Sequence, residues 1–277
     1  MNDPLASLNP QLFAEHTVFV TGGGSGINLG VALAFARLGA AVGLCGRSEE
    51  RLATARKRLE AAGARAVAAA VADVRDPAAV ETALEQSRAE LGPMHTLVCG
   101  AAGNFPAPAE TLSANGFRAV VDIDLNGSFH ASHAAFAQLR ETGGNIVMIS
   151  AAQASQPFAG QVHVCAAKAG VEQLMRTLAL EWGGHGIRAN AIVPGPVEDT
   201  EGVRRLLPGE AAEKAARLVP LGRLGRSDDI GAAAAFLASP LAGYISGTVL
   251  TVDGGGSLAG SGPWNALVAG AMQQRRE

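Results

Sequence analysis

Residues 17–30 read TVFVTGGGSGINLG, a short β-rich run that ends in a cluster of glycines and leads into a helical pattern. Glycines let the backbone turn sharply and approach a pyrophosphate, which then lies on the free amides at the start of the following helix. A glycine cluster alone is weak evidence, but a strand, a loop and a helix in this order give the context that dinucleotide binding requires. This stretch therefore predicts a nucleotide site at the first turn of the fold.

Similar apolar runs recur along the chain, and helical patterns separate most of them. The further predicted strands are 40–47, 64–74, 94–103, 145–152, 187–197 and 248–256, and the predicted helices include 28–40, 48–63, 77–92 and 166–182. Continuously apolar strands that alternate with helices indicate a parallel sheet covered on both faces. We predict a doubly wound α/β (Rossmann) fold, a mostly parallel seven-stranded sheet in a single domain over 1–277. The irregular segment at about 195–226 is a candidate substrate lid.

Composition limits the classes of protein to which the chain can belong. It has 277 residues, 48% of them hydrophobic, and a formal net charge of −3. Because basic residues form no long run, we expect no nucleic-acid partner. Residues 230–252 carry no charge, but Pro240 and glycines interrupt them. We therefore predict a helix and a buried strand there and no membrane span.

Cysteine and histidine usage points to an ordinary protein of a reducing compartment. Cys45, Cys99 and Cys165 are widely spaced and form no CxxC pair, which is typical of small buried side chains. His130 and His133 have no acidic partner at ligand spacing, so we expect no metal site. The chain starts without a basic-then-apolar leader, and its end, QQRRE, lacks a peroxisomal address. We therefore expect a cytoplasmic protein.

The glycine spacing resembles the TGxxxGxG pattern of the short-chain dehydrogenase/reductase family. Two positions depart from that family: Asn28 replaces its third glycine, and Cys99-Gly100 replaces an asparagine pair that is often found before its AG motif. Asparagine tolerates left-handed backbone geometry but adds a side chain near the phosphates. The resemblance implies a cofactor site that includes Thr21, Gly22, Gly24, Ser25, Gly26 and Ile27.

The end of the second predicted strand bears on the choice between NAD and NADP. An NAD-specific enzyme usually places an acid there to bind the ribose 2′-hydroxyl. This chain reads LCGRS, and Arg47 and Ser48 offer donors suited to a 2′-phosphate. We therefore predict NADP(H), although Arg47 pointing into solvent is the alternative. The resemblance implies further cofactor contacts at Asp73, Val74, Ala101, Lys168, Pro194 and Gly195.

The ketone and alcohol enzymes of this family usually carry a serine, a tyrosine and a lysine, in which the tyrosine donates the proton. The run AAKAGVEQLMRTLALEW (166–182) places Lys168 at the lysine position. Four residues earlier stands Val164, which has no proton to exchange, and Ala151 stands at the serine position. Ser150 is one residue short and is expected to point the other way on a strand. Standard alcohol chemistry is therefore hard to support.

A narrower resemblance is to the 2,4-dienoyl-CoA reductases, above all the peroxisomal type. The segments that carry it are AAGNFPAPAETLS (101–113), DIDLNGSF (122–129), QVHVCAAKAGVE (161–172) and VPGPVEDTEGVRRL (193–206). That type also lacks the tyrosine and uses an aspartate and a lysine at the positions of Asp124 and Lys168. In the mitochondrial type, a catalytic asparagine corresponds to Asn126 and a displaced tyrosine to Gln153.

This resemblance implies NADPH-dependent reduction of a conjugated carbon–carbon double bond in an acyl-CoA thioester, a step of fatty-acid β-oxidation, by a homotetramer. The expected catalytic residues are Asp124, Lys168 and Asn126, and the expected substrate contacts are Asn104, Phe105, Gln153 and His163. Arg204 and Arg205, on the candidate lid, either meet CoA phosphates or lie in solvent.

Two other functions stay open at this point. One is a short-chain oxidoreductase that acts on a different enone or carbonyl. The other is a catalytically silent NADP(H)-binding scaffold, because a fold by itself does not prove activity. Asp124 would then be a structural polar contact.

Overall fold

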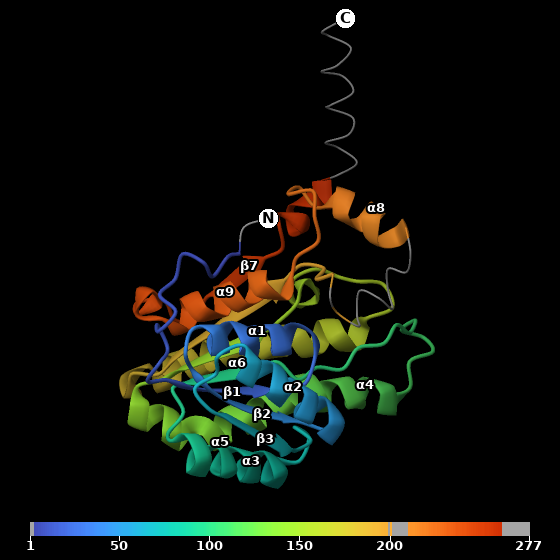
Figure 1. The fold of residues 1–277 in the computed structure, drawn as a ribbon. Helices are drawn as coiled ribbons and strands as arrows, with labels where there is room; N and C mark the ends of the chain where they lie inside the picture. Colours follow the sequence, from blue (N-terminus) through green and yellow to red (C-terminus); the bar gives the residue numbers. More distant parts are fainter. Residues whose placement is uncertain (1–2, 199, 201–209, 262–277) are drawn as a thin grey trace, which may run out of the picture.

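The computed structural model describes residues 3–198, 200 and 210–261. Within them, seven strands form one sheet in the order β3-β2-β1-β4-β5-β6-β7, and all neighbouring pairs are parallel (Figure 1). The strands are β1 Thr17–Thr21, β2 Ala41–Gly46, β3 Val67–Val71, β4 Thr96–Cys99, β5 Asn145–Ile149, β6 Arg188–Pro194 and β7 Val249–Val252. The predicted doubly wound fold is confirmed.

Helices cover both faces of this sheet. On one face lie α1 Gly26–Arg37, α2 Glu49–Ala61 and α9 Ser227–Ala238. On the other lie α3 Pro77–Leu91, α5 Gly127–Thr142 and α6 Val162–Trp182, and α4 Ala114–Val121 packs against α6. A further helix, α8 Glu210–Leu218, stands apart from the sheet at the upper right of Figure 1.

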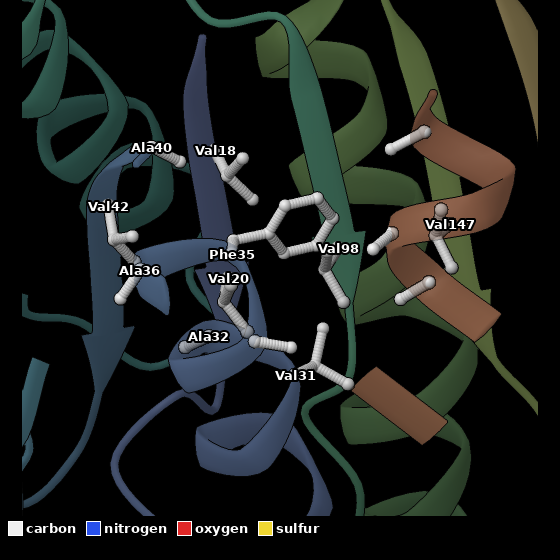
Figure 2. Close-up of a cluster of buried hydrophobic side chains, with 14 of the residues drawn as sticks. Val18, Val20, Val31, Ala32, Phe35, Ala36, Ala40, Val42, Val98 and Val147 are labelled. Carbon is white, nitrogen blue, oxygen red and sulfur yellow. The ribbon is translucent and has the colours of Figure 1, made fainter. Parts of the chain in front are cut away.

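The alternation of side chains along β1 divides the core in two. Val18 and Val20 belong to the cluster under α1 and α9, whereas Phe19 belongs to the cluster under α3, α5 and α6. Figure 2 shows Phe35 of α1 lying against Val18 and Val98, on the strands β1 and β4. Each face of the sheet therefore buries apolar surface, which stabilises the fold by about 25 cal/mol per Å² of buried area. Burial on both faces explains why the strands read as unbroken apolar runs.

The order of the strands defines where a ligand can enter. The chain leaves β1 toward β2 and β3 on one side, and β4 pairs with β1 on the other, with Thr21 opposite Cys99. In a doubly wound sheet, ligands bind at this reversal, beyond the carboxyl ends of the strands. The turn at 22–25 and the segment after Cys99 consequently lie side by side.

Some predicted elements differ from those observed. The strand expected at 94–103 ends at Cys99, because the next amides, those of Gly100 and Ala101, donate to the Thr21 hydroxyl instead of to a neighbouring strand. The last strand, β7, is partly exposed and not buried as predicted, since it lies at the edge of the described sheet.

Two regions bear on the expected lid and on membrane association. Part of the candidate lid, with Arg204 and Arg205, lies outside the described residues. Val197 and Gly225 form an isolated parallel bridge across it. Among the helices of the described residues, none is long and apolar enough to cross a membrane.

At the opposite end of the sheet from the ligand crevice, His16 and His95 lie next to each other, with ring centroids 4.7 Å apart. The Nδ1 atom of His95 accepts a hydrogen bond from the Thr17 amide (3.1 Å), so this nitrogen is unprotonated in the fold. Burial lowers the pKa of both imidazoles below the usual value near 6.5. The fold therefore favours the neutral form of each ring.

We expect acid to destabilise the protein through these rings. Because the folded pKa values are lowered, the unfolded chain binds more protons once the pH falls below about 6.5. The free energy of unfolding should be fully retained above that pH and should decrease as the pH is lowered beneath it. Urea unfolding between about pH 5 and about pH 8 measures this slope. His16→Asn should flatten it, and an unchanged slope in the variant would contradict the assignment.

Candidate active site

The turn after β1 has the geometry of a pyrophosphate cradle. Gly22 and Gly26 both have left-handed backbones, with φ of 67° and 58°, where residues with a Cβ are strained. A Cβ at Gly22 would lie only 2.9 Å from the Cα atom of Ala101. Ser25 precedes α1 and makes no side-chain capping hydrogen bond to it. Because these glycines carry no side chains, a pyrophosphate can reach the amides at the start of α1. The turn therefore fits a dinucleotide.

The carboxyl ends of β2 and β3 carry a cluster of arginines. Arg47 is exposed at the end of β2. Arg51 follows in α2, and the backbone amide of Arg51 donates to the Ser48 hydroxyl (3.3 Å). Arg75 binds both carboxylate oxygens of Asp73 through its Nε atom, each at 3.0 Å. This bidentate contact lowers the pKa of Asp73, with a smaller contribution from Arg47. The edge is cationic and offers donors to an anionic group on a ribose.

Val74, the other residue expected at the adenine end, is buried beneath α5. Its carbonyl oxygen lies 2.9 Å from the Nδ1 atom of His130. A Cβ at Gly127 would lie 2.6 Å from the Cγ2 atom of Val74, so glycine is needed for α5 to come this close. Pro194 and Gly195 lie at the carboxyl end of β6, and the Gly195 amide donates to Val252 (3.0 Å).

Asp124 lies on a π-helical turn, Asp122–Asn126, between α4 and α5. Such turns widen a helix locally and are frequent at functional sites. The Asp124 side chain is fully buried, and its Oδ1 atom accepts a hydrogen bond from the Gly103 amide at 2.7 Å. Its Oδ2 atom has no well-aligned hydrogen bond, although the ammonium of Lys168 is 3.1 Å away. We therefore describe that contact as an ion pair.

Lys168 reaches the same point from α6. Its Nζ atom donates to the Ile149 carbonyl at the end of β5 (3.0 Å), and its side chain is 8% exposed. An ammonium has three N–H donors. In the described residues, Lys168 directs one toward the Ile149 carbonyl and one toward Asp124. The structure thus brings together two residues that are 44 positions apart in the sequence.

The surroundings of this pair explain the absent tyrosine and serine. Val164 is buried and packs with Val120 and Ala167. The Ser150 hydroxyl donates to the Oε1 atom of Glu172 (2.9 Å), so it is committed elsewhere, as the strand alternation predicted. In the described part of the chain, the buried charged groups that meet near Val164 are Asp124 and Lys168.

Of the four residues expected to contact substrate, one is buried and the others lie nearer the surface. His163 is fully buried, neither ring nitrogen has a hydrogen-bond partner in the described residues, and its ring lies 4.5 Å from that of Phe105. Gln153 donates to Gln161 (2.7 Å) on the neighbouring loop. Asn104 is exposed beside Phe105. His163 and Phe105 are thus in contact, whereas Gln153 makes its contact with Gln161.

Asn126 is exposed on the helix surface, and its amide donates to the Oδ1 atom of Asp122 (2.9 Å). Asp124 lies two positions earlier and is buried, so the two side chains point to different sides of the helical segment. The contacts give no support for a catalytic role of Asn126.

An apolar surface near Phe105 was missed in the sequence. Phe105, Phe158 and Val162 are 39%, 40% and 44% exposed, and exposed apolar side chains that gather in one region can mark a ligand site. Phe105 and Phe158 lie on loops that are joined where the Ala107 amide donates to the Gly160 carbonyl (2.8 Å), and Val162 is the first residue of α6. The run QPFAGQV (156–162) held the signal, since its apolar residues do not continue a strand.

Two other expectations concern cysteines and metal. Burial raises the pKa of the Cys45 and Cys99 thiols to about 12, so both are protonated at neutral pH. In the part of the chain that the structure describes, no group of three or more histidine, cysteine, aspartate or glutamate residues is placed to hold a metal ion.

Comparison with known proteins agrees with this geometry. The family model described as enoyl-(acyl carrier protein) reductase matches residues 22–257. The peroxisomal 2,4-dienoyl-CoA reductase of Mus musculus, named as (3E)-enoyl-CoA-producing, is 43% identical over 248 residues, 89% of this chain and 85% of that protein. A probable 2,4-dienoyl-CoA reductase of Bacillus subtilis, named as (2E)-enoyl-CoA-producing, is 43% identical over 245 residues, 87% of this chain and 96% of that protein.

A solved structure adds a relevant parallel. An NADPH-bound short-chain oxidoreductase from Pseudomonas aeruginosa PAO1, described as containing an atypical catalytic center, superposes with a TM-score of 0.82. It is 33% identical, and the match covers 88% of this chain and 97% of that one.

The fold and its glycine turn are those of a dinucleotide-binding protein, and the family match makes the chain an oxidoreductase. More narrowly, the chain belongs to the short-chain dehydrogenase/reductase family.

The buried ion pair should be important for stability. Lys168→Met removes the ammonium and leaves the Asp124 carboxylate buried and unpaired, which typically costs about 3–5 kcal/mol. We expect a decrease of this size in the free energy of unfolding at neutral pH, measured with urea. Adding Asp124→Asn to this variant removes the stranded charge and should recover part of the loss. An additive loss in the double variant would contradict the pairing.

Proposed function

We propose that this protein is an NADPH-dependent reductase of a conjugated carbon–carbon double bond in an acyl-CoA thioester, of the 2,4-dienoyl-CoA reductase type. The observation that carries the proposal is the buried Asp124–Lys168 pair, which stands beside a valine at the position where alcohol chemistry needs a tyrosine. The names of the two relatives, both 2,4-dienoyl-CoA reductases, support the same reaction.

The chemistry of a conjugated thioester suits such a site. NADPH, when bound, supplies a hydride, which adds to the far end of the dienoyl system. The C=C bond at that end becomes single, and its electron pair moves through the conjugated system to the thioester oxygen as a dienolate. A proton is then needed at a carbon atom, and no alcohol oxygen has to be protonated. A tyrosine directed at an alcohol oxygen is therefore unnecessary.

In this proposal, each residue of the pair has a separate task. Lys168, anchored by the Ile149 carbonyl, would bind the nicotinamide ribose with its remaining donor and pairs with the Asp124 carboxylate. Asp124 keeps Oδ1 fixed by the Gly103 amide and orients a water through a hydrogen bond to Oδ2. That water gives a proton to the dienolate carbon and takes one from the Lys168 ammonium, whose proton is restored from solvent.

The opposite wall of the crevice would bind the thioester and its acyl chain. The exposed apolar surface of Phe105, Phe158 and Val162 suits an acyl chain. Asn104, exposed beside Phe105, is the proposed donor to the thioester oxygen, where charge develops in the reaction. His163 backs this wall through its contact with Phe105, and Gln153 borders it. The expected tetramer and cytoplasmic location stay predictions.

Asp124→Asn tests the mechanism. The amide keeps the shape of the side chain but carries no charge to orient the water and to pair with Lys168, so turnover of 2,4-dienoyl-CoA should fall at least about 100-fold. NADPH binding should change little. The measurements are NADPH oxidation at 340 nm for turnover and NADPH fluorescence for binding. Asp122→Asn, two residues earlier on the same π-helical turn, is the matched control and should keep near-normal turnover.

The same assay separates the competing functions. Crotonyl-CoA and a simple ketone are offered beside 2,4-dienoyl-CoA, and the position of the remaining double bond in the product is read by NMR. Ketone reduction as fast as dienoyl-CoA reduction would reject the proposed mechanism. NADPH binding without turnover of any substrate would indicate a scaffold.

Arg47→Ala tests the choice of cofactor. Loss of a charge-assisted contact to the 2′-phosphate should raise the Kd for NADPH about 10- to 100-fold, with the Kd for NADH nearly unchanged. Titration of cofactor fluorescence measures both constants. Arg56→Ala, which removes an exposed arginine paired with Glu60, is the control. Equal loss of affinity for both cofactors in Arg47→Ala would place Arg47 away from the 2′-phosphate.

A further inference from the structure

Two departures from the family pattern, Asn28 and Gly100, touch each other in the fold. Asn28 is the third residue of α1, and Gly100 follows β4 directly. The Nδ2 atom of Asn28 donates to the Gly100 carbonyl at 2.7 Å and lies 3.4 Å from the Gly22 carbonyl. One side-chain amide thus joins the turn after β1 to the segment after β4.

The contact requires glycine at position 100. A Cβ there would lie 2.1 Å from the Oδ1 atom and 2.5 Å from the Cγ atom of Asn28. Real Cβ atoms do not approach other atoms so closely, so one group would have to move. The Asn28 amide cannot move freely, because the carbonyls of Gly22 and Gly100 hold it. The asparagine and the glycine are therefore a matched pair.

This pair lies between the two halves of the site. The Thr21 hydroxyl accepts hydrogen bonds from the amides of Gly100 (3.0 Å) and Ala101 (3.3 Å), which fixes the same segment from the other side. Three residues after Gly100, the Gly103 amide donates to Asp124. A displacement of the segment 100–103 would therefore alter both the turn at Gly22 and the hydrogen bond that orients Asp124.

We propose that Asn28 is a positioning residue that acts through Gly100, holding the pyrophosphate turn and the Asp124 carboxylate in register. The inference rests on the cofactor site of the proposed function. It assigns a role to position 28, where the glycine motif is broken. The Asn28 side chain acts as a clamp between the Gly22 and Gly100 carbonyls and replaces the close backbone packing that a glycine would allow. The two departures compensate each other, and neither is tolerated alone.

A double-mutant cycle tests this inference. Asn28→Gly loses the clamp and should raise the Kd for NADPH about three- to tenfold, with a similar decrease in kcat for 2,4-dienoyl-CoA. Gly100→Asn, with Asn28 in place, introduces the steric overlap and should lose more in NADPH affinity and in stability to urea. The double variant N28G/G100N should bind NADPH within about twofold of wild type, since it places an amide side chain on the other partner. Asn9→Gly, at an exposed position of the first loop, is the control for loss of an asparagine.

The readouts separate this inference from the proposed reaction. NADPH affinity, measured by fluorescence, and urea unfolding do not require an acyl substrate. If the wild type binds NADPH but does not reduce dienoyl-CoA, the proposed reaction fails and the cycle still tests the pair. Unchanged NADPH affinity in Asn28→Gly, or losses in N28G/G100N equal to the sum of the single variants, would overturn the inference.

Discussion

A carboxylate that is removed from water must be paired, and the site is organised around that constraint. Asp124 reaches the interior from a π-helical turn, and Lys168 meets it from α6, 3.1 Å away. The remaining contacts of the pair are backbone groups, the Gly103 amide after β4 and the Ile149 carbonyl at the end of β5. One ion pair therefore joins two helical segments to the carboxyl ends of two central strands.

The parallel sheet explains why these groups meet. All strands run in the same direction, so their carboxyl ends lie at one edge, and the reversal of strand order between β1 and β4 opens a crevice there. At this reversal the Thr21 hydroxyl binds the first two amides after β4. The glycine turn, the Gly103 amide that binds Asp124 and the segment before Phe105 then share one support. The Asp124–Lys168 pair and a turn that fits a dinucleotide are thereby held in neighbouring positions.

Several features of the site were predictable because they depend on local chemistry. The glycine cluster predicted a sharp turn, and Gly22 and Gly26 in that turn have left-handed backbones. The absence of a hydroxyl at Val164 and the presence of Lys168 four residues later were visible directly. Other features depend on contacts across the chain. Nothing local indicated that Asn126 would bind Asp122 on the exposed surface, or that Phe158 and Val162 would stay uncovered. The π-helical turn was equally hidden, because it changes the direction of side chains without changing the helical pattern.

The sequence by itself determined the class of fold and the nucleotide turn. Apolar periodicity and glycine positions act over a few residues and depend little on the rest of the chain. It also determined which acid/base groups were available, since a valine cannot exchange a proton. Only the tertiary structure decided that Asp124 and Lys168 form a buried pair and that Asn28 lies against Gly100. Those contacts join residues 44 and 72 positions apart, and such distances close only when the sheet and its helices pack around a common core.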